Sequence, residues 1–326
     1  MDRWSEETRA PWQEGSREAL VDAGLDPAWV RSLVLRALEE DLGGRSRRGG
    51  LSGPPIGHDV TTEATVPPDA VGVAHLVARA DGVIGGLPLL PIVLAEVAAW
   101  LALPVPFTDI VRLDGDRIKQ DDVLAVLRGP TRVLLVAERT ALNLISRIGG
   151  IATHTRAWAD ALDGTSARVL DTRKTTPGLR ALEKYAVRCG GGTNKRMGLY
   201  DVAMIKDNHK IAAGSITAAY RAVVQRFPGL EIQVEVTTPG EAVEAVSLGA
   251  RFLLCDNMSV DVLGRTVREA RAAATQPIEL EATGGLTLDV ARRYAETGVD
   301  YLSVGALTHS SPVLDVALDL VATPES

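Results

Sequence analysis

The sequence predicts an α/β protein whose larger part is an incomplete α/β barrel. From residue 168 onward, short apolar runs alternate with helical segments. Such alternation is typical of βαβ units that build a parallel sheet. Six runs in about 155 residues are fewer than the eight strands and roughly 250 residues of a complete barrel. We therefore expect a barrel of six to seven strands, with an open doubly wound sheet as the alternative. The runs are 168–171, 202–205, 232–236, 252–255, 278–281 and 301–304.

The part before this pattern is predicted to begin with a loose tail. Residues 1–26 are mainly polar, and terminal segments of this kind are often poorly ordered. Apolar residues at helical spacing predict a helix over 27–40, and residues 43–57, rich in Gly, Pro and Arg, predict a surface loop. A buried helix is expected over 89–101, followed by strands up to Arg139.

Later helix boundaries are predicted from capping and breaking residues. A long helix is expected over 140–162, interrupted at Gly149-Gly150, because glycine is a poor helix former. Thr238 and Glu241 have the spacing of a capping box. Ser311-Pro312 has the order of an N-cap and first helical residue, which predicts a helix start there.

Composition narrows the functional classes. The 326 residues are 46% apolar and 24% charged, which is ordinary for a globular protein, and the length predicts about two domains. A net charge of −7 with 4% aromatic residues disfavours nucleic-acid binding. Two cysteines exclude a disulfide framework, and the apolar stretch 87–107 contains four prolines that would break a spanning helix. We expect a cytoplasmic protein without a membrane partner.

Cations follow the first two predicted strands. Arg173 and Lys174 come directly after the first strand, and Lys206 follows the second. Lys195 and Arg196 lie in a loop after three consecutive glycines. Because the carboxyl ends of parallel strands form the ligand-binding edge of such folds, these cations should converge there. Like charges brought together are costly without an anion, so a small polyanion is the expected ligand, with solvated surface cations as the alternative.

Carboxylates and glycines follow the later strands. Glu235 and Asp256 end adjacent strands, where they are suited to ribose hydroxyls, a metal, a developing positive charge or ion pairs with the cations. Gly284, Gly285 and Gly305 precede helices, whose N-terminal amides bind phosphate well. Tight turns that need glycine are the alternative. The sequence contains no Walker A motif, and no histidine pair has metal-ligand spacing.

Several segments resemble the quinolinate phosphoribosyltransferase family, also called nicotinate-nucleotide pyrophosphorylases (carboxylating). The resemblance covers roughly residues 27–322 in order, and the segment TRKTTPGLR is the most specific part. The segments are HDVTTEATVP (58–67), ERTALN (138–143), LDTRKTTPGLRALEKYAVRCGGG (170–192), MIKDNH (204–209), LLCDN (253–257), EATGGLT (281–287) and VGALTHS (304–310).

The resemblance implies a type II phosphoribosyltransferase fold. An N-terminal open-faced α/β sandwich, residues 27–139 joined by 311–326, would accompany an incomplete barrel over 140–310. The implied assembly is a homodimer, in some members a hexamer. The implied reaction joins quinolinate to 5-phosphoribosyl 1-pyrophosphate, requires Mg²⁺, and yields nicotinate mononucleotide, pyrophosphate and CO₂ for NAD biosynthesis.

The same resemblance implies a role for individual residues. Lys174, Glu235 and Asp256 are the implied catalytic residues, with Glu235 and Asp256 also facing Mg²⁺. Arg139 would reach the site of the partner subunit. The implied quinolinate-binding residues are Arg139, Thr172, Arg173, Lys174, Lys195, Arg196 and Lys206. The implied phosphoribosyl- and phosphate-binding residues are Lys174, Glu235, Asp256, Thr283, Gly284, Gly285, Val304, Gly305 and Ala306.

One departure from the family keeps an alternative open. Lys195 stands where the family usually has histidine, so a related phosphoribosyltransferase acting on another pyridine or aromatic acid is the second reading. Two other classes are a Schiff-base aldolase, which would need one desolvated lysine, and a non-enzymatic anion-binding paralogue. Borohydride trapping with substrate would reveal the aldolase.

Overall fold

The computed structural model describes residues 12, 15–43 and 57–322. These residues form two compact units, Met1–Thr153 with Pro312–Ser326 and His154–Ser311. We call them the sandwich unit and the barrel unit. The predicted boundary between residues 139 and 140 lies earlier than the observed one, which falls inside a continuous helix.

The sandwich unit is built on one antiparallel sheet with the strand order β12-β1-β5-β3. The central strands, β1 (Val71–Ala78) and β5 (Val123–Pro130), are flanked by β12 (Val316–Leu320) and β3 (Phe107–Ile110). β12 pairs Ala74 with Leu320 and therefore fastens the C-terminal segment to the N-terminal unit. A small separate ribbon joins β2 (Gly82–Val83) and β4 (Arg117–Ile118).

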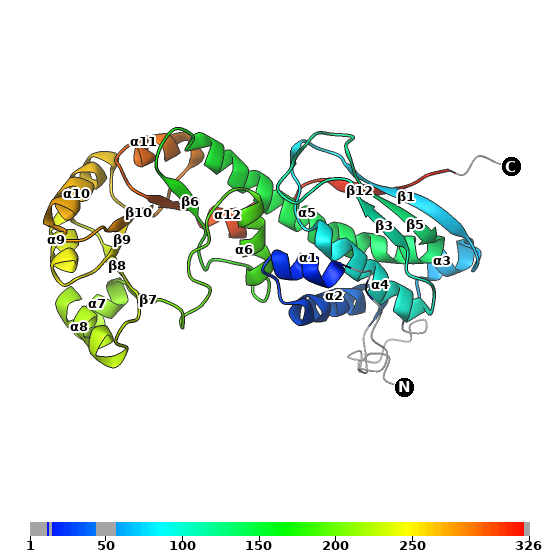
Figure 1. Ribbon diagram of the computed structural model, residues 1–326, viewed down its shortest axis with the longest axis horizontal. Helices are drawn as coiled ribbons and strands as arrows, with labels where there is room; N and C mark the ends of the chain where they lie inside the picture. The colour runs from blue at the N-terminus through cyan, green and yellow to red at the C-terminus, as the bar shows by residue number, and fades with distance from the viewer. Residues whose placement is uncertain (1–11, 13–14, 44–56, 323–326) are drawn as a thin grey trace. The chain divides into compact units, whose positions relative to one another are not determined.

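Helices cover one face of this sheet (Figure 1). One small interior space lies between the sheet and the helices α4 (Leu90–Leu101) and α5 (Thr131–Ala161). The sheet lines it with Leu76 of β1, Leu127 of β5 and Leu318 of β12. The short turn η2 (Leu87–Leu89) precedes α4. The remaining helices are α1 (Ser16–Asp22), α2 (Pro27–Leu42) and α3 (Val60–Thr65). The covered face and the opposite, partly exposed face give the predicted open-faced sandwich.

The expected break of the long helix at Gly149-Gly150 is wrong. α5 begins at Thr131 and continues to Ala161. A Cβ on Gly150 would lie 2.0 Å from the Pro312 carbonyl oxygen, and one on Gly149 would lie 2.7 Å from the Leu314 side chain. The glycines therefore allow the segment 312–314 to cross the helix closely. Packing against this segment outweighs the modest helix-breaking tendency of glycine.

Two further expectations need correction. Residues 16–22 form α1, with Leu20 fully buried, so the predicted tail over 1–26 is structured in this part. Ser311-Pro312 starts no helix, because the short helix before it, α12 (Ala306–His309), has ended and the chain runs on to β12. The Ser311 hydroxyl instead donates to the Leu307 carbonyl oxygen. The predicted loop 43–57 lies, except for its two end residues, outside the described residues.

The barrel unit contains one parallel sheet with the order β6-β11-β10-β9-β8-β7. All six predicted apolar runs correspond to its strands, and the sheet is an incomplete barrel because its end strands, β6 and β7, do not pair with each other. The strands are β6 (Arg168–Leu170), β7 (Ala203–Ile205), β8 (Ile232–Val236), β9 (Phe252–Asp256), β10 (Glu279–Thr283) and β11 (Tyr301–Ser303).

Helices lie on the outer side of this sheet (Figure 1). They are α6 (Arg180–Cys189), α7 (Asp207–Ala213), α8 (Ile216–Arg226), α9 (Pro239–Ser247), α10 (Val260–Ala273), η3 (Leu288–Val290), α11 (Ala291–Ala295) and α12. Leu170, Phe252 and Leu254 form a buried cluster on the inner side, contacted by Met204 and Tyr301. The Thr238 hydroxyl accepts from the Glu241 amide at 3.2 Å, so one half of the predicted capping box of α9 is present. The Glu241 carboxylate accepts from the Thr237 amide at 2.7 Å and not from that of Thr238. Among the described helices, none is long and apolar enough to cross a membrane.

Candidate active site

A cavity of about 730 Å³ lies at the carboxyl ends of the barrel strands. Its volume is in the range usual for small-molecule sites. Residues within all six strands or directly after them contribute to its wall. Every site residue predicted in the barrel unit lines it: Thr172, Arg173, Lys174, Lys195, Arg196, Lys206, Glu235, Asp256, Thr283, Gly284, Gly285, Val304, Gly305 and Ala306.

The predicted cations converge on this cavity. Burial lowers the pKa of the Arg196 guanidinium, and charge repulsion from Arg173 lowers it further. The Nε atoms of Arg173 and Arg196 are both buried and have no hydrogen-bond partner among the described residues. Buried donors are normally paired, and each exception needs a physical reason. Two guanidinium groups close together with unpaired donors are suited to a carboxylate or phosphate.

Lys195 occupies a different environment from the other cations. Its side chain is 8% exposed and forms an ion pair with Glu281, which is 1% exposed. The Lys195 ammonium also lies 5.6 Å from the centre of the Phe252 ring. Burial lowers the pKa of Lys195, Glu281 opposes this shift, and Lys206 and Arg196 add to it.

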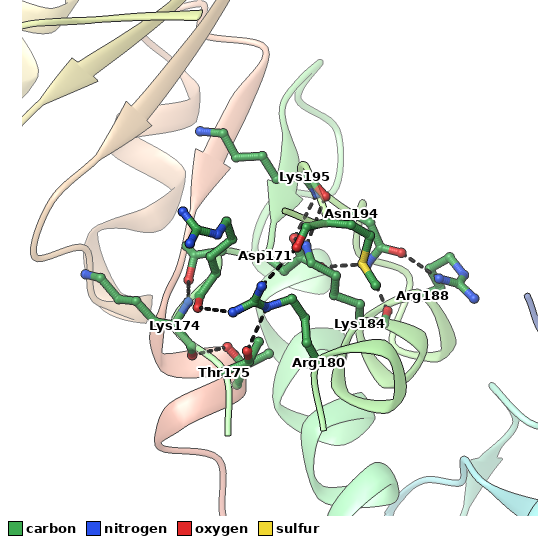
Figure 2. A network of polar contacts seen from close by, with 12 residues as sticks. Asp171, Lys174, Thr175, Arg180, Lys184, Arg188, Asn194 and Lys195 are labelled. Carbon is green, nitrogen blue, oxygen red and sulfur yellow. Dashed lines mark hydrogen bonds and ion pairs between the residues drawn. The ribbon is translucent and has the colours of Figure 1, made fainter. Parts of the chain in front are cut away.

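A buried polar network supports the Lys195 segment from behind (Figure 2). Lys184 Nζ donates to Asp171 Oδ1 at 2.5 Å and to the Lys195 carbonyl oxygen at 2.9 Å. The same Asp171 oxygen accepts from the Lys195 amide at 2.8 Å, while Asn194 Nδ2 donates to the other oxygen at 2.6 Å. Asp171 and Lys184 are both almost fully buried. The network fixes the backbone from which Lys195 and Arg196 extend.

Arg180 connects the two cationic segments. Its Nε donates to the Thr175 hydroxyl at 3.0 Å, and its terminal nitrogens donate to the carbonyl oxygens of Met197 and Arg173 at 3.0 and 3.4 Å. The segment after β6 and the segment after α6 are thereby tied together. In Figure 2 the side chains of Lys174 and Lys195 extend to the same side of this framework.

The two predicted carboxylates lie on neighbouring strands. Glu235 of β8 is opposite Leu254 of β9, so Asp256 lies two residues farther along on the same face. Glu235 lies 3.4 Å from Lys206 Nζ and accepts from the Asp207 amide at 3.3 Å. Asp256 accepts from Asn257 Nδ2 at 2.8 Å. Among the described residues, no three His, Cys, Asp or Glu side chains are grouped as a metal site.

The predicted glycines have steric reasons for their identity. Gly284 has φ of +96°, and a Cβ there would lie 2.4 Å from Asn257 Oδ1. Gly285 has φ of +57° with open space around the position of a Cβ. A Cβ on Gly305 would lie 2.9 Å from the Lys174 side chain. The chain backbone can therefore approach a ligand closely at the ends of β10 and β11.

Arg139 differs from the other predicted site residues. It lies on α5 in the sandwich unit and does not line the cavity. Its side chain is 64% exposed, and its terminal nitrogen lies 3.9 Å from a carboxylate oxygen of the neighbouring Glu138. The predicted role of Arg139 in a partner subunit stays a prediction.

The sequence did not assign Glu281, Asn257, Ser303 or His309 to the site, although each lines the cavity. Glu281 carried a usable signal, because it is a charged residue within the otherwise apolar strand segment Leu280–Ala282. In a barrel strand, a buried charge on the inner side points to a paired or functional group. The Ser303 hydroxyl is buried without a partner in the described part of the chain.

Two family models match this chain. The C-terminal domain of quinolinate phosphoribosyl transferase matches residues 151–319, and its N-terminal domain matches residues 59–148. The chain belongs to the quinolinate phosphoribosyltransferase family. The two models together span both units, so the family assignment covers the sandwich as well as the barrel.

Curated relatives agree with this assignment. Nicotinate-nucleotide pyrophosphorylase [carboxylating] of Mycobacterium leprae is 45% identical over 302 residues, covering 92% of this chain and 100% of that protein. Quinolinate phosphoribosyltransferase [decarboxylating] 1b of Nicotiana tabacum is 36% identical over 306 residues, covering 89% and 82%. Because each alignment covers most of this chain and most of the relative, the match includes both the sandwich unit and the barrel unit.

Solved structures of the family have the same fold. Nicotinate-nucleotide pyrophosphorylase from Francisella tularensis matches with a TM-score of 0.80 at 30% identity, covering 90% of this chain and 96% of that one. The enzyme from Ehrlichia chaffeensis matches with a TM-score of 0.78 at 32% identity, covering 89% and 98%. The predicted fold class is confirmed.

Proposed function

We propose that this protein transfers the phosphoribosyl group of 5-phosphoribosyl 1-pyrophosphate to quinolinate with loss of CO₂. The carrying observation is the cationic end of the cavity, where Arg173 and Arg196 lie close enough to repel each other and Lys195 and Lys206 line the same wall. Carboxylates match guanidinium groups of this kind. The family membership supports the same activity over a Schiff-base aldolase or a non-enzymatic anion binder. Lys195 beside Glu281 gives no reason to favour another acid.

The reaction balances without a protein nucleophile. The ring nitrogen of quinolinate forms a bond to the anomeric carbon as the bond to pyrophosphate breaks, and pyrophosphate leaves with the electron pair. The carboxylate next to the now cationic nitrogen then leaves as CO₂. The electron pair left on the ring carbon is stabilised by the adjacent positive charge and takes a proton. Nicotinate mononucleotide, CO₂ and pyrophosphate result.

The chain's residues serve this reaction through position and charge. Thr172, Arg173, Lys195, Arg196 and Lys206 are proposed to hold the two carboxylates of the acid. When the acid is held with its ring nitrogen against the anomeric carbon, the bimolecular step becomes effectively unimolecular, which lowers the entropic part of the barrier. Lys174 is proposed to contact both the acid and the pyrophosphate.

Glu235 and Asp256 are proposed to face the ribose. Bond cleavage develops positive charge on the ribose ring, and preorganised carboxylates stabilise such charge electrostatically. The 5-phosphate is proposed to lie against Thr283–Gly285 and Val304–Ala306. Gly284, Gly285 and Gly305 line the cavity without side chains, which supports a close approach of the phosphate to the backbone there.

Glu235 and Asp256 fit Mg²⁺ in the manner of substrate-bridged sites. Mg²⁺ keeps several waters and is usually held by one or two carboxylates together with substrate phosphates. A pair of acidic side chains on adjacent strands meets this requirement without a third protein ligand. When bound, Mg²⁺ supplies positive charge to the pyrophosphate oxygens.

The assembly and location are proposed from the family. We propose a cytoplasmic homodimer in which Arg139 serves the partner subunit's site. The exposure of Arg139 on α5 supports its availability to a partner. A content of only two cysteines is compatible with a reducing compartment.

An assay of two products tests the proposed activity. Purified protein with 5-phosphoribosyl 1-pyrophosphate, Mg²⁺ and quinolinate is expected to release CO₂ and pyrophosphate in equal amounts. Nicotinate, which lacks the carboxylate next to nitrogen, is the control and should release no CO₂. Turnover with another pyridine acid but not with quinolinate would establish the alternative substrate. Chelation of Mg²⁺ should abolish turnover, and its re-addition should restore it.

A further inference from the structure

Glu281 is a buried carboxylate inside the barrel. It lies in the middle of β10, 1% exposed, and it lines the cavity. Its Oε2 accepts from Lys195 Nζ, whereas its Oε1 is buried with no hydrogen-bond partner among the described residues. A buried carboxylate with half of its acceptor capacity unused is costly. Its presence needs an explanation beyond local packing.

Lys195 reaches Glu281 from a different segment. It follows the bridge between Thr193 and Leu170 beside β6, whereas Glu281 lies two strands away in the sheet order. Its ammonium lies over Phe252, a member of the apolar inner cluster. The ion pair therefore joins two separate segments on the inner side of the barrel, and both of its members line the cavity.

We propose that Glu281 is a positioning residue that holds the Lys195 ammonium at the inner wall of the active site, where it meets a carboxylate of the acid substrate. The inference rests on the proposed function, because it assigns Lys195 to the acid. Glu281 acts through Lys195 and does not itself touch the substrate. A point charge on a flexible four-carbon stem needs such an anchor, whereas the planar guanidinium groups of Arg173 and Arg196 are partly preorganised.

Glu281 also keeps Lys195 protonated. The groups that face Lys195 are Glu281 from β10, Arg196 from its own segment, Lys206 after β7 and the Phe252 ring from β9. Cys255 of β9 pairs with Ala282 and so lies on the other face of the sheet, where burial together with the charge of Glu281 raises the pKa of its thiol to about 12, so it stays neutral. Burial, Lys206 and Arg196 all lower the pKa of Lys195, and Glu281 opposes them.

Loss of the Glu281 charge therefore has a defined sign. The pKa of Lys195 would fall further, and the ammonium would lose its proton at a lower pH. Binding of the acid that depends on this cation would then weaken from the alkaline side. A purely structural ion pair would change stability without moving this limb of the pH profile.

The test is Glu281→Gln, which keeps the shape and removes the charge. We expect the KM for quinolinate to rise about 10- to 100-fold, as for outer-shell groups that orient a ligand-binding side chain, with a smaller change in the KM for 5-phosphoribosyl 1-pyrophosphate. Between about pH 6 and about pH 10, the alkaline limb of kcat/KM for quinolinate should move to lower pH. The proposal would be overturned if the KM for quinolinate stayed the same and the alkaline limb of the kcat/KM profile kept its position.

The matched control is Glu269→Gln. It makes the same chemical change in an exposed pair with Arg265, 2.9 Å apart on α10 and outside the cavity. Its kinetics and pH profile should equal those of the unaltered protein. If unaltered protein does not convert quinolinate, the proposed function fails. If it does, and Glu281→Gln behaves like this control, the positioning role alone fails.

A second pair of variants keeps the test decisive if Glu281→Gln folds poorly. Lys195→Met is compared with the double variant Lys195→Met/Glu281→Gln, which removes both charges and leaves no buried ion unpaired. Because Glu281 acts through Lys195, the second substitution should not raise the quinolinate KM further. A rise of 10-fold or more from Lys195→Met to the double variant would show that Glu281 acts independently and would overturn the proposal.

Discussion

Two buried lysines of the barrel unit have opposite surroundings. Lys184 and Asp171 are enclosed, and both Asp171 oxygens accept hydrogen bonds, from Lys184, Asn194 and the Lys195 amide. Lys195 and Glu281 line the active-site cavity, and one Glu281 oxygen has no partner in the described part of the chain. Complete pairing is what a supporting network needs. A charged pair whose hydrogen bonds are incomplete, and which lines a cavity, can still interact with a ligand there.

The contrast separates stability from activity within one small region. The network of Lys184 holds the backbone at residue 195, and the side chain of the same residue enters the cavity. Burial raises the pKa of Asp171 and lowers that of Lys184, and their mutual attraction opposes both shifts. Such a pair is strongly affected when one member is removed, whatever its net value as a pair.

Lys184→Met should therefore have the largest effect on stability. It leaves Asp171 buried without its cation, which costs about 3–5 kcal/mol of the free energy of unfolding. Urea denaturation at neutral pH measures the change. A loss below about 1 kcal/mol would mean that the Lys184–Asp171 network contributes little to stability, and the contrast with Lys195 and Glu281 would fail.

Arg173→Ala should have its main effect on activity. Its backbone oxygen still accepts from Arg180, and no buried carboxylate loses a partner. We expect kcat/KM for quinolinate to fall about 100-fold or more, which is about 3 kcal/mol of lost transition-state binding, since a buried charged contact to the acid is removed. The free energy of unfolding should change by less than about 0.5 kcal/mol. Unaltered kinetics in this variant would remove Arg173 from the site.

Glu269→Gln should have the smallest effect and provides the baseline. The Arg265 and Glu269 side chains are 64% and 45% exposed, so solvent and salt screen their attraction. The free energy of unfolding should change by no more than about 0.5 kcal/mol. Denaturation in low and high salt checks this, and a larger change would show that exposed pairs of this protein are not an adequate reference.

Much of the barrel and its site could be predicted from local sequence. The six apolar runs correspond to the six parallel strands because buried strands are short and apolar between turn residues. The residues that follow those runs line one cavity because the carboxyl ends of parallel strands share an edge. Glu281 was not assigned to the site because the depth at which a strand residue meets the cavity is set by how the strands fold around it, and the sequence does not give that depth.

Helix continuity was predicted less well. Gly149 and Gly150 suggested a break in α5, but the helix continues because the segment 312–314 packs against the space that the glycines leave. Ser311-Pro312 had the order of a helix start, yet the Ser311 hydroxyl bonds to Leu307 and the chain turns into β12. The first error concerns packing between residues far apart in the chain. The second concerns the pairing of β12 with β1, which is also a long-range contact that local propensity does not include.

The sequence by itself determined the strand pattern, the family and the set of cations, carboxylates and glycines that surround the cavity. Only the tertiary structure decided how these groups are paired. Lys184 and Lys195 are eleven positions apart and chemically identical, yet one lies in a closed network and the other at the wall of a cavity. The reason is that burial, partner geometry and the pKa of a charged group all depend on which distant segments fold around it.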